Sequence, residues 1–288
     1  MSRGPAREDA RRDIEHVLAT MQGHLDGIHA HEPGVRDGRD PEELHQMRTA
    51  TRRLRADLRA VRDIFEPDEV ARLRGELRWL GAALGAARDA DVQRDYLRGL
   101  RGLTHGETVM VARLVQTLER EQARRRVAVL AALDTPRYQR LLRELDTRIQ
   151  HPPLVTEDFA LRDVAAAAFA RLRRVVEDLP ARPSAQALHA VRLAVKRARY
   201  AAELAQRGRH AHRFVDKAVE LQDILGEHQD AAITERRLRG ALRRARGVTA
   251  RAGVRRLLDR QRARRAAARA AFFAAWPKLE RRGAKAWE

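Results

Sequence analysis

Hydrophobic residues recur at intervals of three and four along most of this 288-residue chain, and strict alternation of apolar and polar residues is rare. Spacing of this kind places apolar side chains on one face of an α-helix. The first such segment carries Ile14, Val17, Met21, Leu25 and Ile28 on one face. The pattern predicts an all-α protein, because the β-branched runs that favour strands are also few.

Glycine, proline and other helix-ending residues separate the predicted helices. The segment from Glu32 to Pro41 contains two glycines and two prolines and is predicted to be a loop. The next helix is expected to end near Phe65, and Pro67 or Asp68 is suited to begin the one after it. Further breaks are expected at residues 104–106, 135–136, 151–153 and 180–184.

The order of these elements repeats after the double proline at residues 152–153. Each half contains an amphipathic helix, a proline-containing loop, a helix with a row of basic residues, a short turn and a helix that carries Leu-Gly. Helices joined by short connections pack as antiparallel bundles. We therefore expect two antiparallel helical bundles, at about residues 8–150 and 155–276, related by an internal pseudo-twofold within a single domain of residues 1–288.

The helix predicted to end near Phe65 carries a row of cations beside a row of apolar residues. At ~100° per residue, each row falls within one arc of the helix. Like charges at this spacing repel by roughly 0.2–0.5 kcal/mol per pair, and the nearby Asp57 points away from the row. The missing anions therefore come either from an external polyanion, which we favour, or from acids on other helices. This first basic row is His45, Arg48, Arg52, Arg55, Arg59 and Arg62, beside Leu44, Met47, Thr51, Leu54, Leu58, Val61 and Phe65.

A second copy of both rows lies about half a chain later. It is shorter, because Glu203 stands at the position that corresponds to Arg59. A Leu-Gly element follows each copy, as Leu84 to Asp89 and as Leu225 to Asp230. The second basic row is His189, Arg192, Lys196 and Arg199, beside Leu188, Val191, Val195, Ala198, Ala202 and Ala205.

Composition narrows the classes of partner and chemistry. The formal net charge is +19, and all but four of the 59 lysines and arginines are arginine, whose planar fork can hold a phosphate by two hydrogen bonds. The absence of cysteine excludes disulfides, thiolate metal sites and a cysteine nucleophile. The charged start and the short longest apolar run, Val164 to Ala170, predict a cytoplasmic protein with no signal peptide and no membrane span.

Four motif blocks in this order resemble the CHAD family, the conserved histidine α-helical domain, over about residues 8–275. The resemblance implies a pair of helical bundles around a basic groove or pore that binds inorganic polyphosphate and is targeted to polyphosphate granules. Many family members are fused to a catalytic triphosphate tunnel domain, whose Glu-x-Glu-x-Lys signature is missing here, so a stand-alone, non-enzymatic member is expected. The blocks are Leu44-His45-Gln46-Met47-Arg48 with Arg52-Arg53-Leu54-Arg55, Leu84 to Val92, Leu188-His189-Ala190-Val191-Arg192 with Lys196 to Tyr200, and Leu225 to Asp230.

The candidate polyphosphate-binding residues are the basic rows and cations on the helices that follow them. His45 and His189 can act either as neutral residues that pack or cap at a helix start, or as donors to phosphate whose protonated form the anion favours. The full candidate set is His45, Arg48, Arg52, Arg55, Arg59, Arg74, Arg78, Arg88, His189, Arg192, Lys196, Arg199, Arg213 and Lys217.

The remaining motif residues are expected to have structural roles. The acids after Leu-Gly, Asp89, Asp91 and Asp230, are predicted to cap helices or to orient arginines of the rows, with no metal or cofactor. Gly85 and Gly226 are predicted to allow a helix end or a close helix contact. The late arginine runs at 124–126, 255–256 and 262–265 are predicted to be solvated helix faces.

Two other functions compete with polyphosphate binding. Sequence-independent binding to a nucleic-acid backbone fits the charge, although aromatic residues make up only 4% of the chain and none interrupts the first basic row, which disfavours base stacking. A metal-dependent phosphohydrolase would need clustered carboxylates, and the acids here fit better as caps or ion-pair partners.

Overall fold

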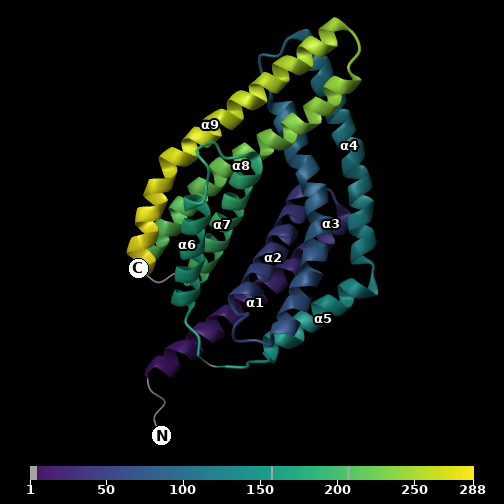
Figure 1. The fold of residues 1–288 in the computed structure, drawn as a ribbon. Helices are drawn as coiled ribbons and strands as arrows, with labels where there is room; N and C mark the ends of the chain where they lie inside the picture. Colours follow the sequence, from purple (N-terminus) through teal and green to yellow (C-terminus); the bar gives the residue numbers. More distant parts are fainter. Residues whose placement is uncertain (1–4, 157, 206–207) are drawn as a thin grey trace. The chain divides into compact units, whose positions relative to one another are not determined.

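The computed structural model describes residues 5–156, 158–205 and 208–288, which are almost entirely helical (Figure 1). Within these ranges, backbone pairing of the β type is limited to an isolated bridge between Phe65 and Leu154, which confirms the predicted all-α class. No helix there is both long and apolar enough to cross a bilayer. The helices are α1 (Pro5–Asp37), α2 (Pro41–Ala60), α3 (Pro67–Gly99), α4 (His105–Leu133), α5 (Pro136–Gln150), α6 (Leu161–Glu177), α7 (Ala185–Leu204), α8 (Arg209–Arg244) and α9 (Val248–Trp287).

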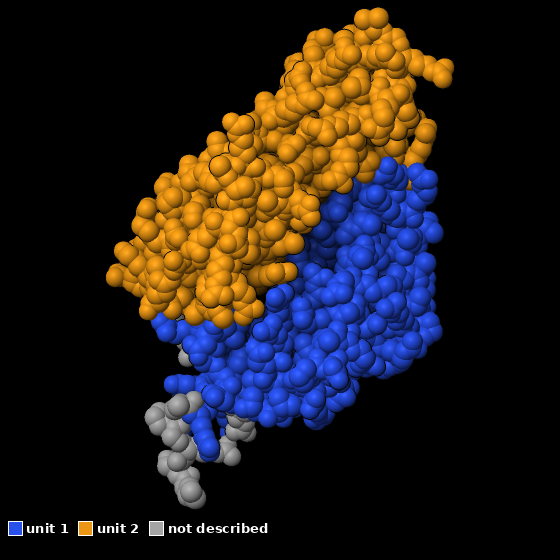
Figure 2. All heavy atoms as spheres, in the orientation of Figure 1, with its two compact units in different colours: residues 1–90, 121–164 blue, residues 91–120, 165–288 orange. Residues whose placement is uncertain are grey.

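The chain divides into two compact units, which Figure 2 colours separately. Unit 1 comprises residues 1–90 and 121–164, and unit 2 comprises residues 91–120 and 165–288. The division falls inside α3 and inside α4. Residues 91–120, which the sequence pattern assigns to the N-terminal repeat, therefore group with the second unit.

In unit 1, α1 packs against α2 and α5. The apolar row of α2 is buried from Met47 onward, with Met47 and Leu54 at 0% exposure, whereas Leu44 at its start is partly exposed. Thr51, the polar member of that row, is also buried, and its hydroxyl donates to the carbonyl oxygen of Met47 at 2.8 Å. Because that hydrogen bond satisfies the hydroxyl, threonine is tolerated in an apolar row.

The predicted loop from Glu32 to Pro41 is too long: α1 continues through Pro33 to Asp37, and only residues 38–40 separate it from α2. Contacts from α4 hold this last turn. The guanidinium of Arg126 donates at 2.9–3.3 Å to three carbonyl oxygens that α1 leaves without intrahelical partners. Arg126 is therefore a structural cap and not part of a solvated face. Its acceptors are the carbonyl oxygens of Val35, Arg36 and Asp37.

In unit 2, α7 packs against α8, and α8 packs against α9. Three aromatic rings join α6, α8 and α9: Phe214 makes edge-to-face contacts with Phe169 at 5.6 Å and with Trp287 at 6.0 Å between ring centroids. The apolar row of α7 is buried as predicted, with Val191 and Val195 at 0% exposure.

The start of α4 is fixed by a buried carboxylate. Glu107 is fully buried and accepts from the backbone nitrogen of Thr104 at 2.9 Å and from its hydroxyl at 2.7 Å. Arg260 of α9 donates to the other oxygen of Glu107 at 3.1 Å. This capping interaction explains the helix break predicted at residues 104–106 and joins α4 to α9 within unit 2.

Two glycine substitutions are expected to have opposite effects on stability. A Cβ added at Gly283 would overlap the buried ring of Phe169, so Gly283→Ala should lower the free energy of unfolding by about 1–3 kcal/mol. Gly23 lies on an exposed part of α1 with no atom near an added Cβ, so Gly23→Ala should raise it by about 0.5–1 kcal/mol. Denaturant unfolding followed by circular dichroism measures both. Equal effects would contradict the close approach of α6 and α9.

Candidate polyanion-binding faces

The first basic row lies along α2 at the edge of the unit 1 core. Asp40 caps this helix by accepting from the backbone nitrogen of Glu42 at 2.8 Å, and Pro41 begins the first turn. The row therefore starts within the second turn and continues down one side. Its predicted site members are all partly exposed, in contrast to the buried apolar row beside them: His45, Arg48, Arg52, Arg55 and Arg59.

Arg48 extends from α2 across Gly85 of α3. A Cβ added at Gly85 would lie 3.4 Å from the Nε atom of Arg48, so the guanidinium group passes in contact distance of this part of α3. The Nη2 atom of Arg48 also lies 3.3 Å from the carboxylate of Asp89, one turn after Gly85. Gly85 is inside α3 and ends no helix. The Leu-Gly element of α3 thus positions an arginine of the first basic row.

The same relation occurs in unit 2, between α7 and α8. A Cβ added at Gly226 would lie 3.5 Å from the Nη2 atom of Arg192. Gly226 is buried inside α8, again away from a helix end. His189, which stands one turn before Arg192, forms a hydrogen bond with the side chain of Gln229 in the same Leu-Gly element.

His45 and His189 share an environment that favours the neutral imidazole. Burial lowers the pKa of His45 below its usual value, and the charges of Arg88, Arg52 and Arg48 add to this effect. Burial likewise lowers the pKa of His189, together with the charges of Arg192 and Lys196. The Nδ1 atom of each ring is buried without a hydrogen-bond partner in the described chain. Each histidine is therefore a neutral group beside several fixed positive charges.

The predicted α3 cations differ in placement. Arg88 lies close enough to His45 to lower its pKa. Arg74 and Arg88 are partly exposed, whereas Arg78 is exposed. These three arginines therefore give the α3 part of unit 1 further positive charge, and Arg88 is placed beside the start of the first basic row.

Arg199, the last residue of the second basic row, is buried in an ion pair within the same helix. Arg199 is 9% exposed, lies 3.0 Å from the carboxylate of Glu203 and stacks over the ring of Tyr200. Lys196 is partly exposed. On α8, Arg213 is exposed and Lys217 pairs with Glu220 at 2.6 Å. Unit 2 therefore presents fewer unburied cations from the predicted set than unit 1.

The acids after Leu-Gly lie inside α3 and α8, so they do not cap helix starts as one reading of the sequence allowed. Asp89 pairs with Arg48, as expected for an acid that orients an arginine of the rows. Asp91 is buried and pairs with Arg94 at 3.2 Å, which is outside both basic rows. Asp230 is partly exposed. Within the described residues, no three histidine, aspartate or glutamate side chains gather as a metal site.

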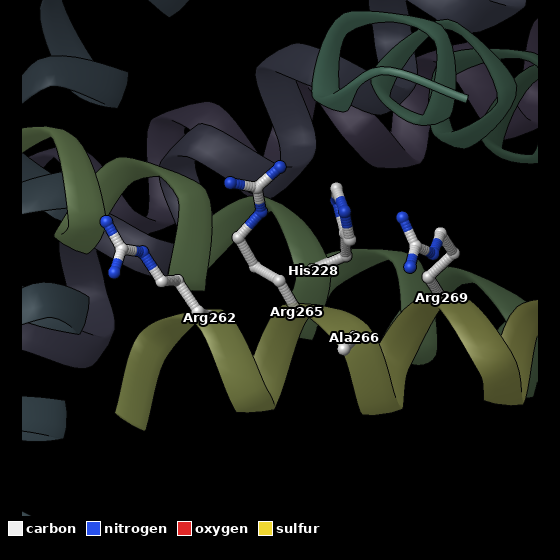
Figure 3. Close-up of a pocket in the computed structure, with 5 residues that line it drawn as sticks. All are labelled: His228, Arg262, Arg265, Ala266 and Arg269. Atoms are coloured by element: carbon white, nitrogen blue, oxygen red, sulfur yellow. The ribbon is translucent and has the colours of Figure 1, made fainter. Parts of the chain in front are cut away.

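The structure also shows basic residues that the sequence pattern placed on solvated faces. Arg264 of α9 donates to Glu227 of α8 at 2.6 Å and lies over the ring of Tyr96. Arg265 donates to Glu235, a buried carboxylate of α8. A pocket of 210 Å³ in unit 2 is lined by His228, Arg262, Arg265, Ala266 and Arg269 (Figure 3). The sequence could have indicated this pocket, because residues 262, 265 and 269 are arginines spaced so that they share one side of a helix.

A family model described as the CHAD domain matches residues 19–239, which is most of the chain. This protein belongs to the CHAD domain family. Among solved structures, the CHAD domain described here is similar to PptA from Streptomyces chartreusis, with 23% identity, a TM-score of 0.79, and coverage of 95% of this chain and 100% of that one. The CHAD domain from the plant Ricinus communis matches with 27% identity, a TM-score of 0.72, and coverage of 92% and 91%. A comparison with curated proteins found no match.

His228 should make the stability of this CHAD domain depend on pH. Burial, followed by the charges of Arg265 and Arg269, lowers its pKa to about 4. The unfolded chain binds a proton at this position near pH 6.5, whereas the folded chain does not until about pH 4. Stability present above pH 6.5 is therefore lost as the pH falls toward 4, by on the order of 3 kcal/mol.

In His228→Gln this part of the loss should disappear. Denaturant unfolding at pH 7 and pH 4.5, in buffers free of phosphate, measures the difference between wild type and variant. His16→Gln, at an exposed position on α1, is the matched control for removal of a histidine. A pH-dependent loss in His228→Gln as large as that of wild type would contradict the assignment.

Proposed function

We propose that this CHAD domain binds inorganic polyphosphate through the basic rows of α2 and α7, without catalysing a reaction on it. The observation that carries the proposal is the shared geometry of the two units. In each, an arginine of the row lies over the glycine of a Leu-Gly element, Arg48 over Gly85 and Arg192 over Gly226. In each, a histidine with an unpartnered buried Nδ1 atom stands one turn earlier.

The chemistry of polyphosphate suits such faces. The polymer is a flexible line of anions with no bases, so its complement is a series of cations on rigid supports. Residues on one row of a helix repeat every ~5 Å, and guanidinium groups can hold phosphate oxygens by paired hydrogen bonds. Release of counterions should dominate the affinity and make it strongly dependent on salt, as for DNA.

We also propose that the two halves of the chain, about residues 8–150 and 155–276, are internal repeats with a pseudo-twofold relation. The pairs α2–α3 and α7–α8 support this, because each combines an apolar row, a basic row and a Leu-Gly element in the same order. The contributions would be unequal, since Arg199 is already paired with Glu203. Association with polyphosphate granules would follow directly from binding the polymer.

A metal-dependent phosphohydrolase would use the acids of the Leu-Gly elements differently. The pairing of Asp89 with Arg48 and of Asp91 with Arg94 supports a structural role for these acids. Release of orthophosphate from polyphosphate in the presence of Mg²⁺ or Mn²⁺, abolished in Asp89→Asn, would instead support a phosphohydrolase.

Reversing one charge in each row should weaken polyphosphate binding strongly. Arg48→Glu combined with Arg192→Glu removes two charge-assisted hydrogen-bonding groups, each worth about 1.5–3 kcal/mol, so the affinity should fall at least ~100-fold. Fluorescence anisotropy with labelled long-chain polyphosphate at fixed salt measures this, and circular dichroism checks that the helices remain.

The control for that variant combines Arg143→Glu on α5 with Arg281→Glu on α9. Both positions are exposed and form no ion pair with a described residue, and the pair makes the same change in net charge. It should weaken binding only through the lower overall charge. Equal losses in the two double variants would remove the basic rows from the binding site.

Competition with duplex DNA distinguishes polyphosphate binding from nucleic-acid backbone binding. At equal phosphate concentration and moderate salt, duplex DNA should fail to displace long-chain polyphosphate, because a flexible single chain can adapt its phosphates to the guanidinium groups of a helix face and a stiff duplex cannot. Displacement by DNA under these conditions would favour the nucleic-acid function.

A further inference from the structure

The pocket of unit 2 lies between α8 and α9, and its residues are different from those of the basic rows. Figure 3 shows Arg262, Arg265 and Arg269 extending from α9 in the same direction, with His228 of α8 among them. The arginines are spaced by three and four residues, so they share one side of α9. Four of the five lining residues carry N–H donors, and no carboxylate lines the pocket.

The arginines of the pocket are only partly neutralised. Arg265 donates to Glu235, but this carboxylate also accepts from Arg239 at 2.6 Å and is therefore shared. Arg262 pairs with Asp259 at 2.9 Å and also lies 3.8 Å from Glu235, which is thus shared by three arginines. Arg269 makes no hydrogen bond or ion pair with any described residue, and the Nε atom of Arg265 is buried without a partner. The pocket consequently keeps an excess of positive charge and unused donors.

His228 adds a polar group that is already desolvated. It is 4% exposed and lines the pocket. With its pKa lowered to about 4 by burial and by Arg265 and Arg269, the imidazole is neutral at pH 7 and carries one N–H donor. A phosphate oxygen is a suitable acceptor for this N–H donor.

The size of the pocket selects a small ligand. At 210 Å³ it is smaller than the roughly 300–1,000 Å³ of pockets that hold drug-sized organic molecules. A tetrahedral oxyanion is compact and presents several acceptors to converging donors. Guanidinium groups bind such an anion by paired, charge-assisted hydrogen bonds. Phosphate has these properties.

We propose that the α8–α9 pocket is a site for a single phosphoryl group, taken either from free orthophosphate or from the end of a polyphosphate chain. Arg269 is the principal ligand, because its guanidinium has no internal partner among the described residues, and Arg262 and His228 complete the set of donors. Binding of free orthophosphate would be independent of the polyphosphate binding proposed above, whereas recognition of a chain end rests on that proposed function.

Titration with sodium orthophosphate at pH 7, followed by calorimetry, tests the site directly. Sodium chloride at matched ionic strength provides the blank. Wild type should show saturable binding, and Arg269→Gln should weaken it at least tenfold. Arg262→Gln, a second pocket variant, should also weaken it, so the test does not depend on one substitution.

The matched control is Arg281→Gln on the same helix. Arg281 is exposed and lies twelve residues beyond Arg269, about 18 Å along α9. Its affinity for orthophosphate should stay within twofold of wild type. The absence of saturable binding beyond the chloride blank would overturn the proposal, as would equal weakening by Arg281→Gln and Arg269→Gln, because general charge attraction would then explain the result.

Short polyphosphate chains with free ends or with both ends esterified identify the source of the phosphoryl group. If the pocket takes chain ends, Arg269→Gln should weaken the free-ended chains and leave the esterified chains unaffected. If it takes the free ion, neither chain should displace bound orthophosphate. Since orthophosphate binding is measured without polymer, and the double charge reversal in α2 and α7 leaves the pocket intact, failure of this site and failure of polyphosphate binding give separate results.

Discussion

The cations of α2 and α7 stand directly beside a buried apolar row on the same helix, and the candidate faces depend on this adjacency. Burial of Met47 and Val191 holds each helix against its unit, which leaves the neighbouring arginines at the edge of the core, partly exposed. An arginine with a long flexible stem would otherwise sample many positions, at a cost in entropy when it binds. Gly85 and Gly226 each lie beside the guanidinium group of an arginine of the rows, Arg48 and Arg192. The packing that forms the core therefore also preorganises the guanidinium groups.

Carboxylates decide how many of these cations remain available to a ligand. An exposed ion pair contributes only about 0–1 kcal/mol, so an incoming phosphate can replace its acid at little cost. Arg48 with Asp89 and Lys217 with Glu220 are pairs of this kind. Arg199 differs, because it is itself buried beside the partly exposed Glu203, and separating the two would leave the guanidinium charge poorly solvated. The two halves of the chain therefore share a plan but differ in the charge that they present.

Burial next to arginines affects His45, His189 and His228 in the same way, since each has its pKa lowered below the usual value. A neutral imidazole can donate one hydrogen bond without adding to the repulsion among the arginines. An anion bound nearby would reverse the balance and favour the protonated ring. The same physical arrangement thus recurs on both basic rows and in the α8–α9 pocket, which are the faces that we propose to bind anions.

Periodicity and helix-ending residues were enough to predict the all-α class, the buried rows and the breaks at residues 104–106 and 180–184, because these depend on local spacing along one helix. Local patterns were wrong at residues 32–37, where Arg126 from α4 holds the end of α1. They also placed Arg265 on a solvated face, although it reaches Glu235 and lines a pocket. Ion pairs, caps and pockets require distances between helices that are remote in sequence. The sequence by itself therefore determined which residues form each row, and only the tertiary structure decided which cations are paired, buried or left open to a ligand.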